Sequence, residues 1–172
     1  DYTGEHVFVN DADGVIIEGG FVSCADPAID PADYTTISGA GNDGGPVFDV
    51  FSAGGDVFLG NLLITGANRN DDASGGGISF TGQVGGALLL SNATVSFNHA
   101  GYGGGVNING TAGPAALVLE QNSLILSNSA TTSGGGIRLE GNTNLYMLDP
   151  ETFVAFNAAP GGYGGGVEII GP

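Results

Sequence analysis

Three consecutive glycines recur four times in the chain, and their spacing constrains the fold more than any other feature. The triplets begin at Gly75, Gly103, Gly134 and Gly164, at intervals of 28, 31 and 30 residues. A regular period of this length is typical of a solenoid, in which each repeat forms one coil and stacks on the next. A short alternating run follows each triplet, as in Ile78-Ser79-Phe80, and alternation at period two predicts a β-strand.

Two further markers divide each repeat. A short apolar run ends in asparagine near the middle of the repeat, at Asn61, Asn92 and Asn122. Another ends in asparagine shortly before the glycines, at Asn68, Asn98, Asn128 and Asn157. Each period therefore holds three strands and three turns. We predict an all-β fold, a single-stranded, three-sided parallel β-helix of about five coils. Parallel crossovers are right-handed as a general rule, so a right-handed coil is expected.

The repeat extends over most of the chain, which is predicted to be one domain, residues 1–172. Residues 36–172 form stacked coils of about 28–31 residues, and residues 1–35 form a partial first coil with a capping loop between Phe21 and Tyr34. The 34 glycines raise the question of disorder, but a hydrophobic fraction of 41% argues against it. Short β-branched and aromatic runs broken by Gly and Asn argue against helical repeats.

The repeated asparagines have a structural explanation. Stacked coils place equivalent residues about 4.8 Å apart, so a column of asparagines can pass amide hydrogen bonds from coil to coil. Asparagine also tolerates the left-handed backbone that a sharp corner requires. We expect all seven asparagines to form such ladders.

The charge excludes several partners. Eighteen acidic residues face only Arg69 and Arg138, and the net charge is -16. Nucleic-acid binding needs several basic contacts to phosphate and is excluded, and an anionic membrane surface would repel the chain. No apolar run is long enough for membrane insertion. Cys24 is the single cysteine, so no internal disulfide is expected, and the start at Asp1 suggests a processed segment.

One pairing of motifs resembles a known family. The turn Ser96-Phe97-Asn98 followed by Gly103-Gly104-Gly105-Val106 is similar to the repeats of the polymorphic outer membrane proteins and related secreted bacterial β-helix proteins. Those repeats carry Phe-x-x-Asn followed by Gly-Gly-Ala-Ile. In this chain Phe97 and Phe156 adjoin their asparagines directly, Ser127 replaces Phe in one repeat, and the third turn residue is Gly.

The resemblance runs from about Val15 to Ile169. It implies a right-handed β-helix located outside the cell or at the bacterial cell surface, associated with the outer membrane. Members of that group are commonly adhesive or structural. The resemblance therefore favours a non-enzymatic function in adhesion, surface coating or fibre and filament assembly.

The alternative is a carbohydrate-active or carbohydrate-binding β-helix domain, similar to polysaccharide lyases or glycosidases. Lyase chemistry would need free basic residues, but Arg138 is expected to face Glu168 on the next coil. Glycoside hydrolysis needs two carboxylates about 5 to 9.5 Å apart, and Asp49 is the one strand carboxylate without an obvious cationic neighbour. His6 and His99 are far apart in the repeat. We expect no catalytic residues.

Calcium is the one cofactor that the sequence suggests, and none is required. Hard cations bind clustered carboxylate oxygens, and the candidate ligands lie in two acidic loops, at Asp11, Asp13, Asp71 and Asp72. The first loop starts like a calcium loop, but the glutamate expected at its twelfth position is replaced by Val22. Solvated acidic loops are the simpler interpretation.

The middle strand of each repeat is apolar at consecutive positions, so one of its two faces must carry apolar side chains outward. Placing Phe58, Leu89, Leu119 and Met147 in the core predicts an exposed stripe of Val57, Leu59, Leu88, Leu90, Val118, Tyr146 and Leu148. Large exposed apolar patches mark interaction sites. The final segment, residues 167–172, stops partway round a coil. We expect self-association or continuation in a larger parent chain, with a surface glycan or protein as other partners.

Overall fold

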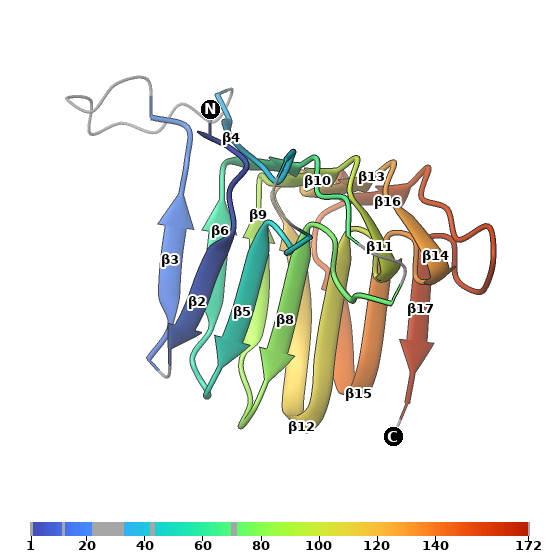
Figure 1. Ribbon diagram of the computed structural model, residues 1–172. Coiled ribbons are helices and arrows are strands. Elements are labelled where there is room, and N and C mark those ends of the chain that lie inside the picture. The colour runs from blue at the N-terminus through green and yellow to red at the C-terminus, as the bar shows by residue number, and fades with distance from the viewer. Residues whose placement is uncertain (1, 12, 22–32, 42–43, 70–71, 172) are drawn as a thin grey trace.

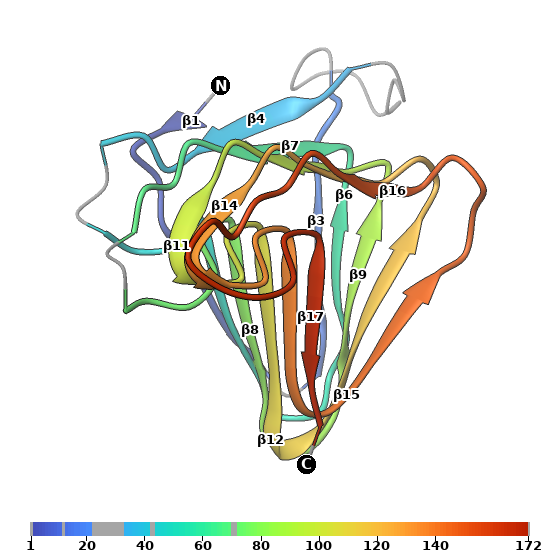
Figure 2. The ribbon, with the colours of Figure 1, turned by 90° about the vertical axis from the view of Figure 1, so that its right-hand side faces the viewer.

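The computed structural model describes residues 2–11, 13–21, 33–41, 44–69 and 72–171, and the statements below refer to these residues. In this part of the chain every element is a β-strand, and the strands form parallel sheets wound into a solenoid, which confirms the predicted fold class. Viewed along its axis the solenoid is triangular (Figure 2). We call its sides the upper, left and right sheets after their positions in that view.

The upper sheet contains one short strand from each coil. In order it consists of β1 (Tyr2–Thr3), β4 (Thr35–Ser38), β7 (Leu62–Thr65), β10 (Thr94–Ser96), β13 (Leu124–Leu126) and β16 (Phe153–Ala155). These strands lie side by side along the top of the molecule (Figure 1). A two-stranded sheet, β11 (His99–Tyr102) with β14 (Ser129–Ser133), follows at the corner.

The left and right sheets converge at the lower corner. The left sheet contains β2 (Val7–Asp11), β5 (Phe48–Ser52), β8 (Ile78–Gly82), the first halves of β12 (Val106–Glu120) and β15 (Ile137–Met147), and β17 (Val167–Ile170). The right sheet contains β3 (Val15–Glu18), β6 (Val57–Gly60), β9 (Ala87–Ser91) and the second halves of β12 and β15. Thus β12 and β15 each turn the corner as one strand, where the repeat predicted two.

The strand register shows how the coils stack. Phe48 pairs with Ile78, Ile78 with Val106, Val106 with Ile137, and Ile137 with Val167. The solenoid makes about four turns, preceded by a first level of β2, β3 and β4 that contains the segment 22–32, outside the described residues. The predicted number of about five coils is therefore slightly too high.

The core is a column of apolar side chains from all three sheets. Phe48 and Phe80 enter it from the left sheet, Leu59 and Leu90 from the right, and all four are fully buried. Because strand side chains alternate between the two faces, the residues between these positions point outward. Since the coils stack in register, equivalent outward residues line up in rows along the outside of the solenoid.

Candidate functional site

The asparagine ladder beneath the upper corner is built from three of the predicted residues. The side-chain Nδ2 of Asn98 donates to Oδ1 of Asn128 at 3.1 Å, and that of Asn128 donates to Oδ1 of Asn157 at 3.1 Å. The backbone N–H groups of Asn98 and Asn128 donate to the same oxygens at 3.0 and 2.9 Å. Asn98 and Asn128 are each 1% exposed. This row is a structural element inside the coil and offers no site to a ligand.

Asn68 was predicted to belong to this row, and that prediction is wrong. In the register Asn68 pairs with His99, so Ala67 occupies the position equivalent to Asn98. The backbone N–H of Ala67 donates to Oδ1 of Asn98 at 3.1 Å, and the Asn68 side chain is exposed. Gly66 occupies the corner position of this coil, where later coils have Phe97 or Ser127, so Asn68 falls one residue beyond the ladder position.

The second asparagine row is shorter than predicted. Nδ2 of Asn92 donates to Oδ1 of Asn61 at 2.8 Å, and both residues adopt left-handed backbone, with φ of 46° and 53°. Asn122 is left-handed too, with φ of 63°, but it follows a second left-handed residue, Gln121, and is exposed. The extra residue moves Asn122 away from the stacking position, so the row contains Asn61 and Asn92 alone among the predicted three.

Arg138 is the centre of a charged cluster on the left sheet. Its NH1 atom lies 2.6 Å from a carboxylate oxygen of Glu140, and its Nε lies 3.4 Å from Glu168. The guanidinium carbon of Arg138 lies over the ring of Tyr102, 4.8 Å from the ring centre. The Ser133 hydroxyl donates to Glu168. The side chains of Arg138 and Glu168 are only 12% and 15% exposed. The predicted pairing of these two residues is confirmed.

Arg69 lies on the same side of the solenoid and is held by backbone oxygens. Its Nε donates to the carbonyl of Gly44 at 3.0 Å, and NH1 donates to Ser74 and, at 3.1 Å, to Gly75. Burial lowers the pKa of the Arg69 guanidinium, and the Asp49 carboxylate raises it in part. The Nε2 of His6 lies 4.0 Å from a carboxylate oxygen of Asp49. Asp49 therefore does have a cationic neighbour, Arg69, contrary to the sequence-based expectation.

The described residues of the acidic loops do not gather into a metal site. Asp13 and Asp72 are exposed at separate turns, while the side chain of Asp11 and the whole of Asp71 lie outside the described residues. Among the residues that the structure does describe, no group of three or more His, Cys, Asp or Glu side chains gathers in a way that could hold a metal ion. Calcium binding by these four residues stays a prediction.

The predicted outer stripe is wrong for four of its seven residues. Val57 is 2% exposed, and Leu59, Leu88 and Leu90 are fully buried. The middle strands are apolar at three consecutive positions, so alternation could not show which side faces the core, and the core takes the first and third positions. Val118 is half-buried on the outer side, and Tyr146 and Leu148 are exposed.

An apolar outer row does exist on the right sheet. In β6 and β9 it lies one residue out of phase with the prediction, whereas Val118 and Tyr146 belong to both. The register aligns its members Ile16, Phe58, Leu89, Val118 and Tyr146. Ile16 is 74% exposed, and the row extends across β3, β6, β9, β12 and β15. Acidic residues border it, since Glu18 and Glu120 stand at the next outward positions and Asp56 precedes β6. We call this set the right-sheet row.

The outer side of the upper sheet carries a second apolar surface. Its outward residues are Thr36, Leu63, Thr94, Leu124 and Phe153 in one row and Ser38, Thr65, Ser96, Leu126 and Ala155 in the next, although Ser96 is only 4% exposed. The corner residues Gly39, Gly66, Phe97, Ser127 and Phe156 follow directly. We call these fifteen residues the upper face. The sequence pattern alone did not predict this face, although its leucines and phenylalanines follow the repeat.

Two phenylalanines of the upper face are in an unfavourable conformation. Phe97 and Phe156 have φ of 55° and 57°, and their side chains are 71% and 87% exposed. Left-handed backbone costs about 1–2 kcal/mol for an ordinary L-residue, and Gly66 and Ser127 occupy the same corner position in other coils. The sharp corner accounts for the left-handed backbone at this position. It does not account for the phenyl rings, which point away from the core.

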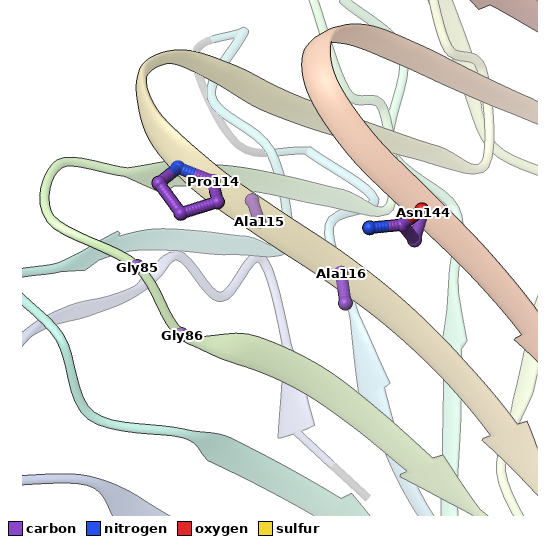
Figure 3. Close-up of a pocket in the computed structure, with 6 residues that line it drawn as sticks. All are labelled: Gly85, Gly86, Pro114, Ala115, Ala116 and Asn144. Carbon is purple, nitrogen blue, oxygen red and sulfur yellow. The ribbon is translucent and has the colours of Figure 1, made fainter.

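A small open hollow of about 170 Å³ lies at the lower corner, beside the right-sheet row. Figure 3 shows its lining, in which Gly85 and Gly86 come from one loop, Pro114, Ala115 and Ala116 from β12, and Asn144 from β15. Glycines and alanines leave the space unfilled, and Asn144 is the one long polar side chain in the lining. The hollow is smaller than the roughly 300–1,000 Å³ typical of small-molecule pockets, and few polar groups line it.

The fold and these surfaces define the class of the chain as a parallel β-solenoid with two apolar outer faces. Comparison with protein-family models, with curated proteins and with solved structures finds no match. Within the described ranges no helix is long and apolar enough to cross a bilayer.

Proposed function

We propose that this chain is a non-catalytic β-solenoid of the cell surface or the extracellular space that acts through its outer faces in adhesion, surface coating or fibre assembly. The observation that carries the proposal is the presence of large apolar side chains on two outer faces. Ile16, Phe97 and Phe156 are between 71% and 87% exposed. A protein of net charge -16 has ample polar surface for solubility, so these side chains point to contact with another surface.

The test combines two measurements on one preparation. Soluble uronate polymers and neutral glycans, incubated with the protein and calcium, should yield no new reducing ends and no unsaturated products. Light scattering over a concentration series, and retention on polysaccharide-coated and protein-coated beads, should show association or adhesion. A protein that neither associates nor adheres under these conditions, and that releases product, would refute the proposal.

A carbohydrate-active domain is the second candidate, and Asp49 is the observation that favours it. This carboxylate lies on the outer side of β5 and is partly exposed; His6 lies 4.0 Å from it, and it raises the pKa of Arg69 in part. A carboxylate beside two cationic or titratable side chains can take part in acid–base chemistry. If product appears, Asp49→Ala should abolish it, whereas the matched change Asp72→Ala in an exposed loop should not. Product formation that survives Asp49→Ala would leave this candidate without its site.

A further inference from the structure

The upper face is free of ionisable residues. The strands β4, β7, β10, β13 and β16, with the corner residue that follows each, contain no Asp, Glu, Lys, Arg or His. The chain as a whole has 18 acidic residues. The left sheet carries Asp49, Glu140 and Glu168, and the right sheet carries Glu18 and Glu120. In a strongly acidic solenoid, these five strands and their corners are therefore neutral.

This neutral side is also apolar. Phe153 is 53% exposed at the end of one outward row, and the same row contains Leu63 and Leu124, which are half-buried. Phe97 and Phe156 extend the surface at the corner, where a left-handed backbone makes a phenyl side chain unfavourable. The face has the combination that an interface needs, large apolar side chains with neutral hydroxyl groups between them.

The charge distribution indicates which partner this face suits. Two copies of a chain of charge -16 repel one another, and contact through the left or right sheet would bring carboxylates together. Contact through two upper faces would bury no carboxylate and keep the acidic sides apart. An anionic membrane would be repelled by the same charge. We propose that a second copy of this chain covers the upper face, and that the two copies are related by a two-fold axis.

The geometry predicts a weak dimer. Five strands spaced about 4.8 Å apart and roughly three residues long give a face on the order of 20 Å by 10 Å, apart from the phenyl rings. Two such faces bury less than the roughly 1,200–2,000 Å² of a stable interface. We therefore expect dissociation in the micromolar to millimolar range. Added salt should strengthen the dimer because it screens the repulsion between the two acidic bodies.

The experiment measures molecular mass by sedimentation equilibrium from micromolar to millimolar protein, at low and at high salt. The wild-type mass should rise from the monomer value of 17.0 kDa towards twice that value, and more readily at high salt. The double variant Phe97→Asn, Phe156→Asn should weaken association at least tenfold. Asparagine suits left-handed backbone, so this variant should fold at least as stably as the wild type, and its thermal midpoint checks this.

Two control variants test whether association depends on the apolar side chains of the upper face. Ser127→Asn changes the same corner position without removing an apolar side chain, and it should associate like the wild type. Ile16→Asn removes the most exposed residue of the right-sheet row, and it should associate like the wild type as well. A wild-type chain that stays monomeric throughout, or a double variant that dimerises normally, would overturn the proposal, as would loss of association in Ile16→Asn alone.

This inference rests on the proposed function, since both assume that the outer surface meets another surface. The outcomes are nevertheless distinguishable. A monomeric chain that is still retained on coated beads would refute the dimer and leave adhesion intact. Association through the right-sheet row would refute this interface and leave assembly intact.

Discussion

Asn128 shows how one side chain connects three coils. Its Oδ1 accepts from the backbone and the side chain of Asn98, and its Nδ2 donates to Asn157 and, at 2.9 Å, to the carbonyl of Val95. The residue is 1% exposed, so water cannot take the place of its side chain as a hydrogen-bond partner. A buried polar group that loses its partner costs more than an average hydrogen bond contributes.

We expect Asn128→Ala to lower the free energy of unfolding by about 1–3 kcal/mol, because the buried backbone N–H of Asn98 would lose its acceptor. The Nδ2 of Asn98 would keep only the carbonyl of Ile64. The matched change Asn144→Ala, at an exposed position on β15, should change it little. Denaturant titrations of the two variants provide the measurement. Equal midpoints would show that the ladder contributes nothing specific to stability.

At the scale of elements, the glycine triplets let neighbouring coils stack without a gap. A Cβ atom on Gly104 would overlap the carbonyl oxygen of Ser129 and would lie 2.7 Å from that of Gly135 in the next coil. The backbone of Gly104 also donates to the carbonyl of Gly134 at 3.1 Å. The close approach of two backbones, and not only turn flexibility, therefore requires glycine here.

We expect Gly104→Ala to destabilise the protein by about 3 kcal/mol or more, since the new methyl group meets backbone that cannot move aside as a side chain can. Gly166→Ala is the control, because a Cβ atom at Gly166 has nothing within 4 Å. Thermal melting followed by circular dichroism compares the two. A Gly104→Ala variant as stable as Gly166→Ala would mean that the coils can separate at the glycine turn at little cost.

At the scale of the whole molecule, negative charges far outnumber positive ones. Eighteen acidic residues and two arginines give a net charge of -16, and both arginines are engaged in local contacts, Arg69 with backbone carbonyls and Arg138 with Glu140 and Glu168. Most of the acidic surface is therefore left without a cation from the chain. Stability should depend on ions from the solvent.

Melting temperature should rise with monovalent salt, because salt screens the repulsion among the carboxylates. If the loops of Asp13 and Asp72 bind calcium, calcium at equal ionic strength should raise it further by mass action. The double change Asp13→Asn, Asp72→Asn should abolish the additional rise in melting temperature with calcium and keep the rise with sodium chloride. Superimposable titrations with the two salts would show that these loops are solvated and bind no ion.

The sequence by itself determined the period, the three sides of the coil, the parallel stacking and most of the main asparagine ladder. These features repeat along the chain, and a repeated side chain in a stacked fold must meet its own equivalents. Arg138 and Glu168 could be paired for the same reason, since they hold one position in successive coils.

The tertiary structure decided which side of each middle strand faces the core. Val57, Phe58 and Leu59 are all apolar, so alternation held no information there, and packing against the other two sheets selected the first and third. The same packing assembled the upper face, because residues about thirty apart become neighbours only when the register is known. Local pattern specifies a strand, but the direction of its side chains depends on the core that all the strands form together.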